Sequence, residues 1–279
     1  MSVTYAPSDE LGLIRTTARR FLEDRFGLEA VRDLMMSEEG FDRGLWNEIA
    51  DLGWTGLAIG EEHGGAGYGL TELSVVLEEM GRLVTPGPFF ASAVLATAAI
   101  DTAGDERQKA MLLPYLASGE QIATLAVFEE SRGWDVSDLT TTATADGADW
   151  ILDGAKRFVL SAHSADVVIV AAVLGDGIGL FVVPTDVSGL EIKQTSVLDP
   201  TRRQGDVQLN GVRVEGSALL GGGESSDSLA ETLAIGTACL AAEQVCGAQR
   251  CLEMSVDYAK TRYQFGRPIG SFQSIKHRC

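Results

Sequence analysis

The sequence predicts an α+β protein of several domains: an all-α N-terminal domain, an antiparallel β-barrel-like middle domain and the first, incomplete part of a C-terminal helical bundle. Two patterns predict this order. Apolar residues recur every three to four positions from residue 8 to about 120 and again after Ser228, whereas the chain from Leu125 to Val214 is rich in Val, Thr and Ile with frequent turn pairs. The 279 residues, 45% of them apolar, fit two to three ordinary domains. We place the domains at 1–120, 121–222 and 223–279.

The N-terminal domain is predicted to consist of amphipathic and buried helices. Segment 89–103 is small and apolar, and segment 105–117 is amphipathic, so each predicts a helix. The glycine-dense stretch 60–67 can only be loop. Three earlier helices are predicted from the stripes Leu11, Ile14, Ala18, Phe21 and Leu22, then Phe41, Leu45, Ile49 and Leu52, then Leu73, Val76, Leu77 and Met80.

The middle domain is predicted to be built from hairpins. Asp153-Gly154 and Asn210-Gly211 each stand between two short apolar runs, and Asn-Gly in particular suits the tight turns of hairpins. Residues 166–174 and 180–183 are continuous apolar runs, typical of well-covered strands. We therefore expect an antiparallel sheet rather than a βαβ array.

One long helix is predicted from Ser228 to about Tyr263, after the linker 221–226. The linker lacks the GK[ST] sequence of a phosphate-binding loop. A second helix has just begun its apolar stripe, at Phe272 and Ile275, when the sequence ends. Because such helices normally bury their apolar faces in a bundle, we expect either partner subunits or a further part of the protein to complete it.

The charge of the chain is strongly negative but unevenly placed. The formal net charge is −18, which argues against a general nucleic-acid binder. From Asp257 to Cys279, however, five cations stand against one anion. This cationic end predicts either a specific anionic ligand or a carboxylate-bearing partner surface.

Cysteine and histidine residues predict no metal or disulfide chemistry. The four cysteines lie in the last fifth of the chain without a CxxC pair, which is typical of free thiols in a reducing compartment. The three histidines share no i, i+4 spacing, so no metal site is expected. Neither a secretory signal nor an apolar run long enough to span a bilayer is visible. We predict a soluble, cytoplasmic protein.

Four stretches resemble the acyl-CoA dehydrogenase family in the expected order. The last carries a match to the family signature RxxFGxPIxxFQ, running from Arg262 through Phe265-Gly266 and Pro268-Ile269 to Phe272-Gln273. The other three are Leu45-Trp46 to Gly64-Gly65, Trp150 to Asp166, and Leu198-Asp199 to Leu220-Gly221. The resemblance covers essentially the whole chain.

This resemblance implies an FAD-dependent enzyme that oxidises an acyl-CoA thioester to the 2,3-enoyl-CoA. A glutamate removes the α-proton while hydride leaves for the flavin, and an electron-transfer flavoprotein is the usual acceptor. The family forms homo- or hetero-oligomers, in which the signature reaches the FAD of the adjacent subunit. The residues implied here are Arg262, Gln264, Phe265, Ile269 and Phe272. The alternative is a solvated helix end whose cations are placed by the helix dipole.

The chain departs from the family at positions that contact the cofactor. Phe128 stands where a Thr hydrogen-bonds the flavin, and Trp134 where a Ser lies near the pyrophosphate. In the W-I-T/S stretch beneath the flavin, Phe158 replaces the Trp and Leu160 replaces the hydroxyl. Losing such polar contacts weakens FAD binding by about a few kcal/mol unless they are replaced. Stacking of Trp134 on the flavin is one replacement.

The catalytic residue of this chain is unknown. In most of the family the glutamate lies near the end of the bundle, which would place it beyond Cys279. In some branches it lies on the long helix, and the matching position here is Gly236. No other motif in the sequence supplies a catalytic base in place of this glutamate.

Three interpretations therefore stay open. The chain is an acyl-CoA dehydrogenase or a fragment of one. In the second interpretation, the chain is a non-catalytic subunit that completes a partner's FAD site, similar to actinobacterial heteromers that act on steroid side-chain thioesters. The third interpretation is an assembly or scaffold protein without flavin. Flavin content, alone and with a partner, separates them.

Overall fold

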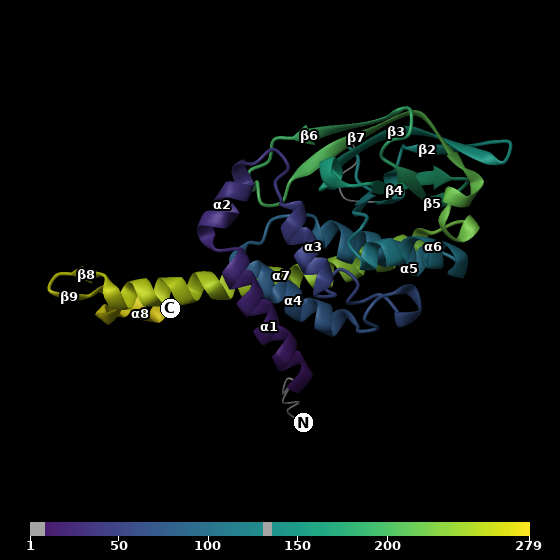
Figure 1. Cartoon of the computed structure of the whole chain (residues 1–279). Coiled ribbons are helices and arrows are strands. Elements are labelled where there is room, and N and C mark those ends of the chain that lie inside the picture. The colour runs from purple at the N-terminus through teal and green to yellow at the C-terminus, as the bar shows by residue number, and fades with distance from the viewer. Residues whose placement is uncertain (1–8, 131–135) are drawn as a thin grey trace, which may run out of the picture.

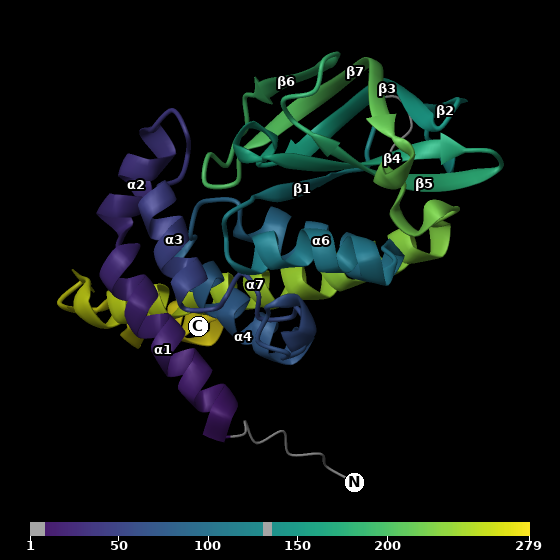
Figure 2. The same cartoon turned by 45° about the vertical axis from the view of Figure 1, so that its right-hand side comes forward.

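The structure, a computed structural model, describes residues 9–130 and 136–279. A β-sheet lies over a layer of helices, and one very long helix runs among them and projects past them (Figure 1). Figure 2 shows the sheet and the helices as two separate layers. This succession of helices, sheet and long helix confirms the fold class that the sequence predicts.

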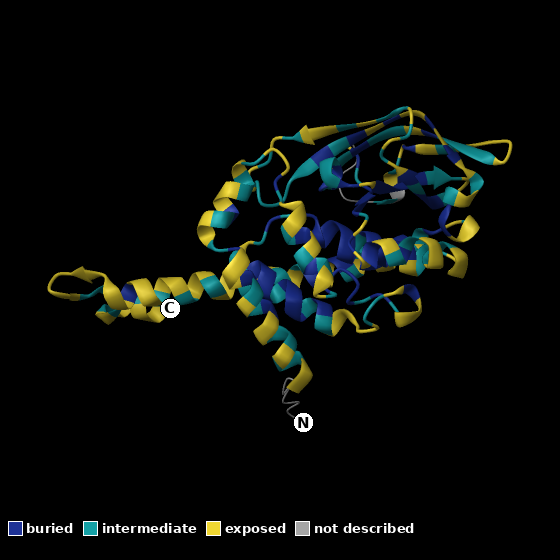
Figure 3. Ribbon diagram, viewed as in Figure 1, coloured by how far each residue is buried: buried dark blue, intermediate teal, exposed yellow. Residues whose placement is uncertain are grey.

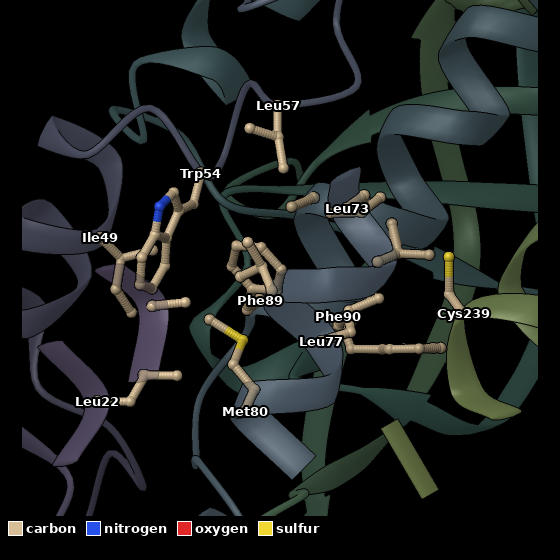
Figure 4. Close-up of a cluster of buried hydrophobic side chains, with 14 of the residues drawn as sticks. Leu22, Ile49, Trp54, Leu57, Leu73, Leu77, Met80, Phe89, Phe90 and Cys239 are labelled. Carbon is tan, nitrogen blue, oxygen red and sulfur yellow. The ribbon is translucent and has the colours of Figure 1, made fainter. Parts of the chain in front are cut away.

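The N-terminal helices share one core. Ala18 and Leu22 of the first predicted stripe, Ile49 of the second and Leu73 to Met80 of the third are buried, as expected. Figure 4 shows five of them, Leu22, Ile49, Leu73, Leu77 and Met80, in one cluster with Phe89, Phe90 and Cys239. The helices are α1 (Asp9–Arg25), α2 (Leu28–Met36), α3 (Arg43–Asp51), η1 (Glu61–His63), α4 (Leu70–Leu83), the π-helix η2 (Phe90–Ala96), α5 (Thr97–Ala103) and α6 (Glu106–Ala117).

The sheet is mostly antiparallel, as predicted, with two parallel pairings. Its strand order is β1-β4-β2-β3-β7-β6, and β5 pairs with β4. β1 runs parallel to β4 from Ala123 opposite Val167 to Ala126 opposite Val170, and β2 pairs in parallel with β4 at Thr142 opposite Val173. The strands are β1 (Ala123–Ala126), β2 (Thr142–Asp146), β3 (Asp149–Leu160), β4 (Val167–Leu174), β5 (Gly177–Pro184), β6 (Leu190–Thr195) and β7 (Gln204–Glu215).

The two predicted hairpin turns are wrong, because both sequences lie inside long strands. β3 and β7 each run for 12 residues. Their register shifts so that Asp153 on β3 faces Asn210-Gly211 on β7. There the Gly211 N–H donates to Asp153 Oδ1 at 2.7 Å. A β-bulge uses the same Gly and Asn residues as a hairpin turn, which explains the error.

The long helix α7 (Ser226–Thr261) has 36 residues and two unlike halves. The inner half packs on α4, η2 and α5. It crosses α4 closely, since an added Cβ at Gly81 would lie 2.1 Å from the Glu243 carbonyl oxygen. From Val245 onward the chain projects from the rest and is mostly exposed (Figure 3). We call residues 245–279 the outer arm and the remainder the body.

The outer arm ends in a small hairpin and a short helix. These are β8 (Tyr263–Gln264), β9 (Arg267–Pro268), η7 (Ile269–Ser271) and α8 (Gln273–Arg278). By length and composition alone α7 is apolar enough to cross a membrane, and 22% of its most apolar stretch is buried. One such helix is weak evidence, because long helices of soluble proteins meet the same criterion. The expected absence of a membrane span therefore stays a prediction.

Candidate functional site

The family-signature residues form the tip of the outer arm. Arg262 ends α7, and the β8–β9 hairpin turns at Phe265-Gly266, where φ is 52° and 76°. Two consecutive positive φ angles are those of a type I′ turn, which is rare for a phenylalanine. The Phe265 side chain is 91% exposed, and Arg262 and Gln264 are exposed as well. The turn therefore presents these three side chains to the surroundings.

The tip is held in shape by contacts inside the arm. The Ile269 N–H donates to the Arg262 carbonyl oxygen at 2.8 Å, which closes the hairpin onto the helix end. The Phe265 and Phe272 rings meet edge to face with centroids 6.1 Å apart, and the Arg267 guanidinium lies 4.2 Å from the centroid of the Phe272 ring. Ile269 and Phe272 therefore support the tip and are themselves half-buried.

The residues predicted beneath the flavin lie on the sheet. Phe158 has φ 57° at a second bulge of β3, between Lys156 and Val159, and its ring is half exposed. A non-glycine residue in this conformation marks local strain, which is common at ligand sites. Leu160 packs against the N-terminal core, and Phe128 packs against the core shared by α5, α6 and β4. Trp134 lies outside the described residues.

A buried ion pair fixes β3 behind these residues. Lys156 Nζ donates to Glu129 Oε1 at 2.7 Å and to the Val127 carbonyl oxygen at 3.1 Å, and both charged side chains are buried. Thr140 and Thr141 add hydrogen bonds to the same carboxylate. Burial lowers the pKa of Lys156 to about 8, the hydrogen bond to Glu129 opposing that effect.

The same contacts set the charge of Glu129. Burial by itself raises the pKa of Glu129, but the hydrogen bonds from Lys156, Thr140 and Thr141 outweigh it and lower that pKa to about 2. The carboxylate is therefore ionised at neutral pH with its oxygens already used. It is a structural anchor rather than a free base.

Gly236, the position that the resemblance matches to the base of some family members, carries no side chain. It is buried on the inner half of α7, and an added Cβ would lie 2.5 Å from Leu95 Cδ2, the end of a flexible side chain that would have to shift. Two helical turns further, Glu243 pairs with Arg202 from the β6–β7 connection, and Arg202 lies 4.8 Å from the centroid of the Phe90 ring. Sequence reasoning missed Arg202, because no spacing pattern links it to Glu243.

The predicted site residues form two groups that lie far apart within this chain. Leu160 and the Gly236 region of α7 contact the same N-terminal core. The tip, by contrast, lies at the far end of the projecting arm, away from the sheet (Figure 1). Among the described residues, no group of three or more His, Cys, Asp or Glu could hold a metal ion.

The two groups differ in how they match FAD. Phe128 and Leu160 offer the flavin no polar side chain, and their carbonyl oxygens already accept from Arg157 N and from Thr124 Oγ1. The tip offers an exposed guanidinium, an amide and an aromatic ring, which suit the phosphates and rings of FAD. The tip therefore offers groups that suit FAD, whereas Phe128 and Leu160 offer it no polar side chain.

Three family models match successive parts of the chain. The N-terminal domain of acyl-CoA dehydrogenase matches residues 8–120, the middle domain 124–212 and the C-terminal domain 227–279. FAD is the cofactor of this family, and similar structures were crystallised with FAD or FADH2.

Individual proteins agree with the models. The acyl-CoA dehydrogenase IpdE2 of Mycobacterium tuberculosis is 32% identical over 273 residues, which cover 98% of this chain and 70% of that protein. The Tcur3481-Tcur3483 steroid acyl-CoA dehydrogenase G363A variant superposes with a TM-score of 0.87 at 36% identity, over 97% of this chain and 72% of that one. The ChsE4-ChsE5 complex of Mycobacterium tuberculosis gives 0.90 at 26%, over 99% and 73%.

The fold, the ordered motifs and these matches over nearly the whole length lead to one conclusion. The chain belongs to the acyl-CoA dehydrogenase family.

Proposed function

We propose that the chain serves the FAD-dependent dehydrogenation of an acyl-CoA thioester to its 2,3-enoyl-CoA, as the subunit that completes the FAD site of a partner. The partner is another acyl-CoA dehydrogenase-like subunit. In this proposal the outer arm reaches the partner's FAD site. Arg262, Gln264 and Phe265 are the residues that contact the partner's cofactor.

The observation that carries the proposal is the exposed tip. Phe265 is 91% exposed in a strained turn, at the end of a helix whose outer half buries only Ala259. A large ring held in solvent by an unfavourable backbone angle is stabilised by a compensating contact, and no described residue of the body supplies one. A cofactor site on another subunit supplies that contact.

The tip chemistry suits this role. When bound, FAD accepts the hydride that the acyl chain loses. The Arg262 guanidinium can hold a phosphate group through two parallel hydrogen bonds, which orients the cofactor. Gln264 adds a neutral donor and acceptor, and Phe265 covers an aromatic face and excludes water.

The body supports a complementing role rather than independent catalysis. Gly236 offers no carboxylate, and a side chain at this position would have to displace Leu95 Cδ2. Glu129 is committed to Lys156, Thr140 and Thr141. In this proposal the partner supplies both the base and the polar cradle of the flavin, whereas in the rival interpretation the base lies beyond Cys279. A chain that oxidises acyl-CoA by itself remains the main rival, and a scaffold without flavin is the third.

The test is the flavin content of the purified chain, alone and with an acyl-CoA dehydrogenase-like subunit from the same organism. We expect the flavin absorbance to appear only in the mixture. Arg262→Ala should then weaken FAD retention about tenfold to a hundredfold, the effect of losing a hydrogen-bonded charge. Lys276→Ala is the matched control, because Lys276 is an exposed cation of the same arm outside the tip.

Each rival predicts a different result. One FAD per chain in the protein purified alone would exclude the complementing role. Flavin in the mixture that survives Arg262→Ala unchanged would remove the tip from the site. A complex that forms without flavin would favour the scaffold. The acyl group, the electron-transfer flavoprotein as acceptor and the cytoplasmic location stay predictions.

A further inference from the structure

The connection between β6 and β7, residues 196–203, leaves the sheet and descends toward the helical layer (Figure 1, Figure 2). We call it the strap. Its turn is closed by Asp199, whose Oδ1 accepts from Thr201 N at 3.0 Å and from Thr201 Oγ1 at 2.6 Å. The Arg202 N–H donates to the Asp199 carbonyl oxygen at 3.2 Å. The strap therefore has a shape of its own, and its contacts with the helices determine where it lies.

Arg202 joins the strap to the helical layer. Its guanidinium pairs with the carboxylate of Glu243 on the inner half of α7, and it lies 4.8 Å from the centroid of the Phe90 ring on η2. The Phe90 residue is 8% exposed, and the Glu243 side chain is 15% exposed. Arg202 thus covers a place where η2 and α7 meet.

The neighbouring residue holds the base of the strap. Arg203 donates hydrogen bonds to three carbonyl oxygens at the end of α2. Its own carbonyl oxygen accepts from Ser161 N at 2.9 Å, at the end of β3. Because the base is fixed on both sides, the pair of Arg202 with Glu243 is the contact that decides whether the rest of the strap lies against α7.

This pair leaves one carboxylate oxygen without a donor. Oε1 of Glu243 meets Arg202, whereas Oε2 is buried and has no hydrogen-bond partner among the described residues. The buried carboxylates of Glu79 and Glu129, by contrast, have both oxygens hydrogen-bonded. An oxygen that has lost its water without gaining a donor destabilises the closed position, while the attraction to Arg202 stabilises it. Opening would return water to both oxygens.

The strap borders positions that the resemblance assigns to the dehydrogenase site. Glu243 lies about two helical turns beyond Gly236, so the two residues share one face of α7. Leu160 pairs with Gln204, the first residue after the strap. Movement of the strap therefore changes access to this part of the body.

We propose that the strap is a lid over this part of the body, latched by the pair of Arg202 with Glu243 and released when that pair breaks. Closed, the strap shields Phe90 and Glu243 from water. Open, it uncovers the place where η2 and α7 meet. The lid belongs to the body alone, so it does not rest on the proposed role of the tip.

The position of the lid is measured as the distance between two spin labels in the full chain, by double electron–electron resonance. One label is placed at Leu198→Cys, the fully exposed tip of the strap, and the other at Glu231→Cys, an exposed site on α7. Glu231 lies about 18 Å along the helix from Glu243, which suits the method. Three cysteines are first replaced by serine, namely Cys246, Cys251 and Cys279. The latched chain should show one main distance.

Arg202→Met should raise the fraction of open chains about tenfold. It removes the cation that pairs with Glu243, and the carboxylate then regains water only by opening. Combining Arg202→Met with Glu243→Met should return the distribution to that of the unsubstituted chain. Two apolar side chains of similar length can pack against Phe90 in place of the charges.

Two further variants separate the latch from general charge loss. Arg213→Met is the matched control, because Arg213 also forms two ion pairs but lies on β7, away from the strap. It should leave the distribution unchanged. Glu243→Gln keeps the shape of the side chain and should raise the open fraction, because Arg202 then meets only a neutral acceptor.

A thermal midpoint within a few degrees of that of the unsubstituted chain shows that a variant folds, and Glu243→Gln provides the test if Arg202→Met does not. An unchanged distribution in the folded variant would overturn the proposal. So would a double variant as open as Arg202→Met, or an equal opening in Arg213→Met. Failure of the proposed function appears differently, as a mixture with the partner subunit that retains no FAD.

Discussion

The body and the outer arm differ in which side chains they bury. In the body even a lysine, Lys156, is fully buried, because Glu129 and a carbonyl oxygen satisfy its ammonium group. In the arm Ala259 is the one buried residue, while Tyr258 and Phe265 are largely exposed. Among the described residues, side chains of the body are largely buried against one another, whereas those of the arm are largely exposed.

In the proposed function, this difference separates residues that stabilise the fold from residues that contact the partner. Substitutions in the body should therefore change the free energy of unfolding, and equivalent substitutions in the arm should not. Two predictions compare the two regions, and a third tests how closely the body packs against the long helix.

The largest effect is expected from Lys156→Met. It leaves the Glu129 carboxylate buried without its cation, and breaking a buried pair in this way costs about 3–5 kcal/mol of unfolding free energy. Urea unfolding followed by circular dichroism measures the loss. Lys260→Met is the matched change in the arm, because Lys260 pairs with Asp257 at 3.6 Å on the surface. Its effect should stay within about 0.5 kcal/mol. Equal losses would contradict the distinction between the regions.

A smaller effect is expected where the body meets the long helix. Gly81→Ala places a methyl group 2.1 Å from the Glu243 carbonyl oxygen, so the α4–α7 crossing must open at a cost of about 1–3 kcal/mol. Gly12→Ala in α1 meets nothing within 4 Å and should stabilise the protein by up to about 1 kcal/mol. The same chemical change thus has opposite signs at two helical glycines. A neutral Gly81→Ala would show that the crossing is looser than described.

The sequence was sufficient for the fold class because helical and strand periodicities are local. It failed at Asp153-Gly154 and Asn210-Gly211, where a bulge and a turn share the same residues and only the partner strand decides between them. It also gave no sign of α2, which follows Gly27 as a short helix with one buried residue, Val31. Long-range pairing, rather than local preference, determines these features.

The candidate site was predictable to a similar degree. The signature at Arg262 to Phe265 stands in consecutive sequence, so a resemblance could locate it. The close approach of Leu95 to Gly236 and the pair of Arg202 with Glu243 join residues 141 and 41 positions apart. Such contacts leave no spacing pattern in one sequence. The proposed role of the tip itself stays a prediction until FAD retention is measured.

The smallest effect concerns two carboxylates with the same pKa for different reasons. The hydrogen bonds from Lys156, Thr140 and Thr141 lower the pKa of Glu129 to about 2 against the opposing effect of burial. The Arg82 hydrogen bond lowers the pKa of Glu253 to about 2 at the protein surface. Because each folded pKa lies below the unfolded value of 4.5, each contributes stability that is complete above pH 4.5 and is lost as the pH falls toward 2.

Raising the salt concentration should change the pKa values of the two carboxylates by different amounts. Raising the ionic strength from 0.1 to 1 M shortens the Debye length from about 10 to about 3 Å, which screens exposed pairs more than buried ones. The pKa of Glu253 should therefore rise by about one unit, while that of Glu129 changes little. Carboxyl-carbon NMR titration at both salt concentrations measures each group separately, with Glu253→Gln and Glu129→Gln assigning the signals. If both values moved together, the pair at the base of the outer arm would be as shielded as the pair in the body, and the arm would be a more firmly fixed part of the molecule than its exposure indicates.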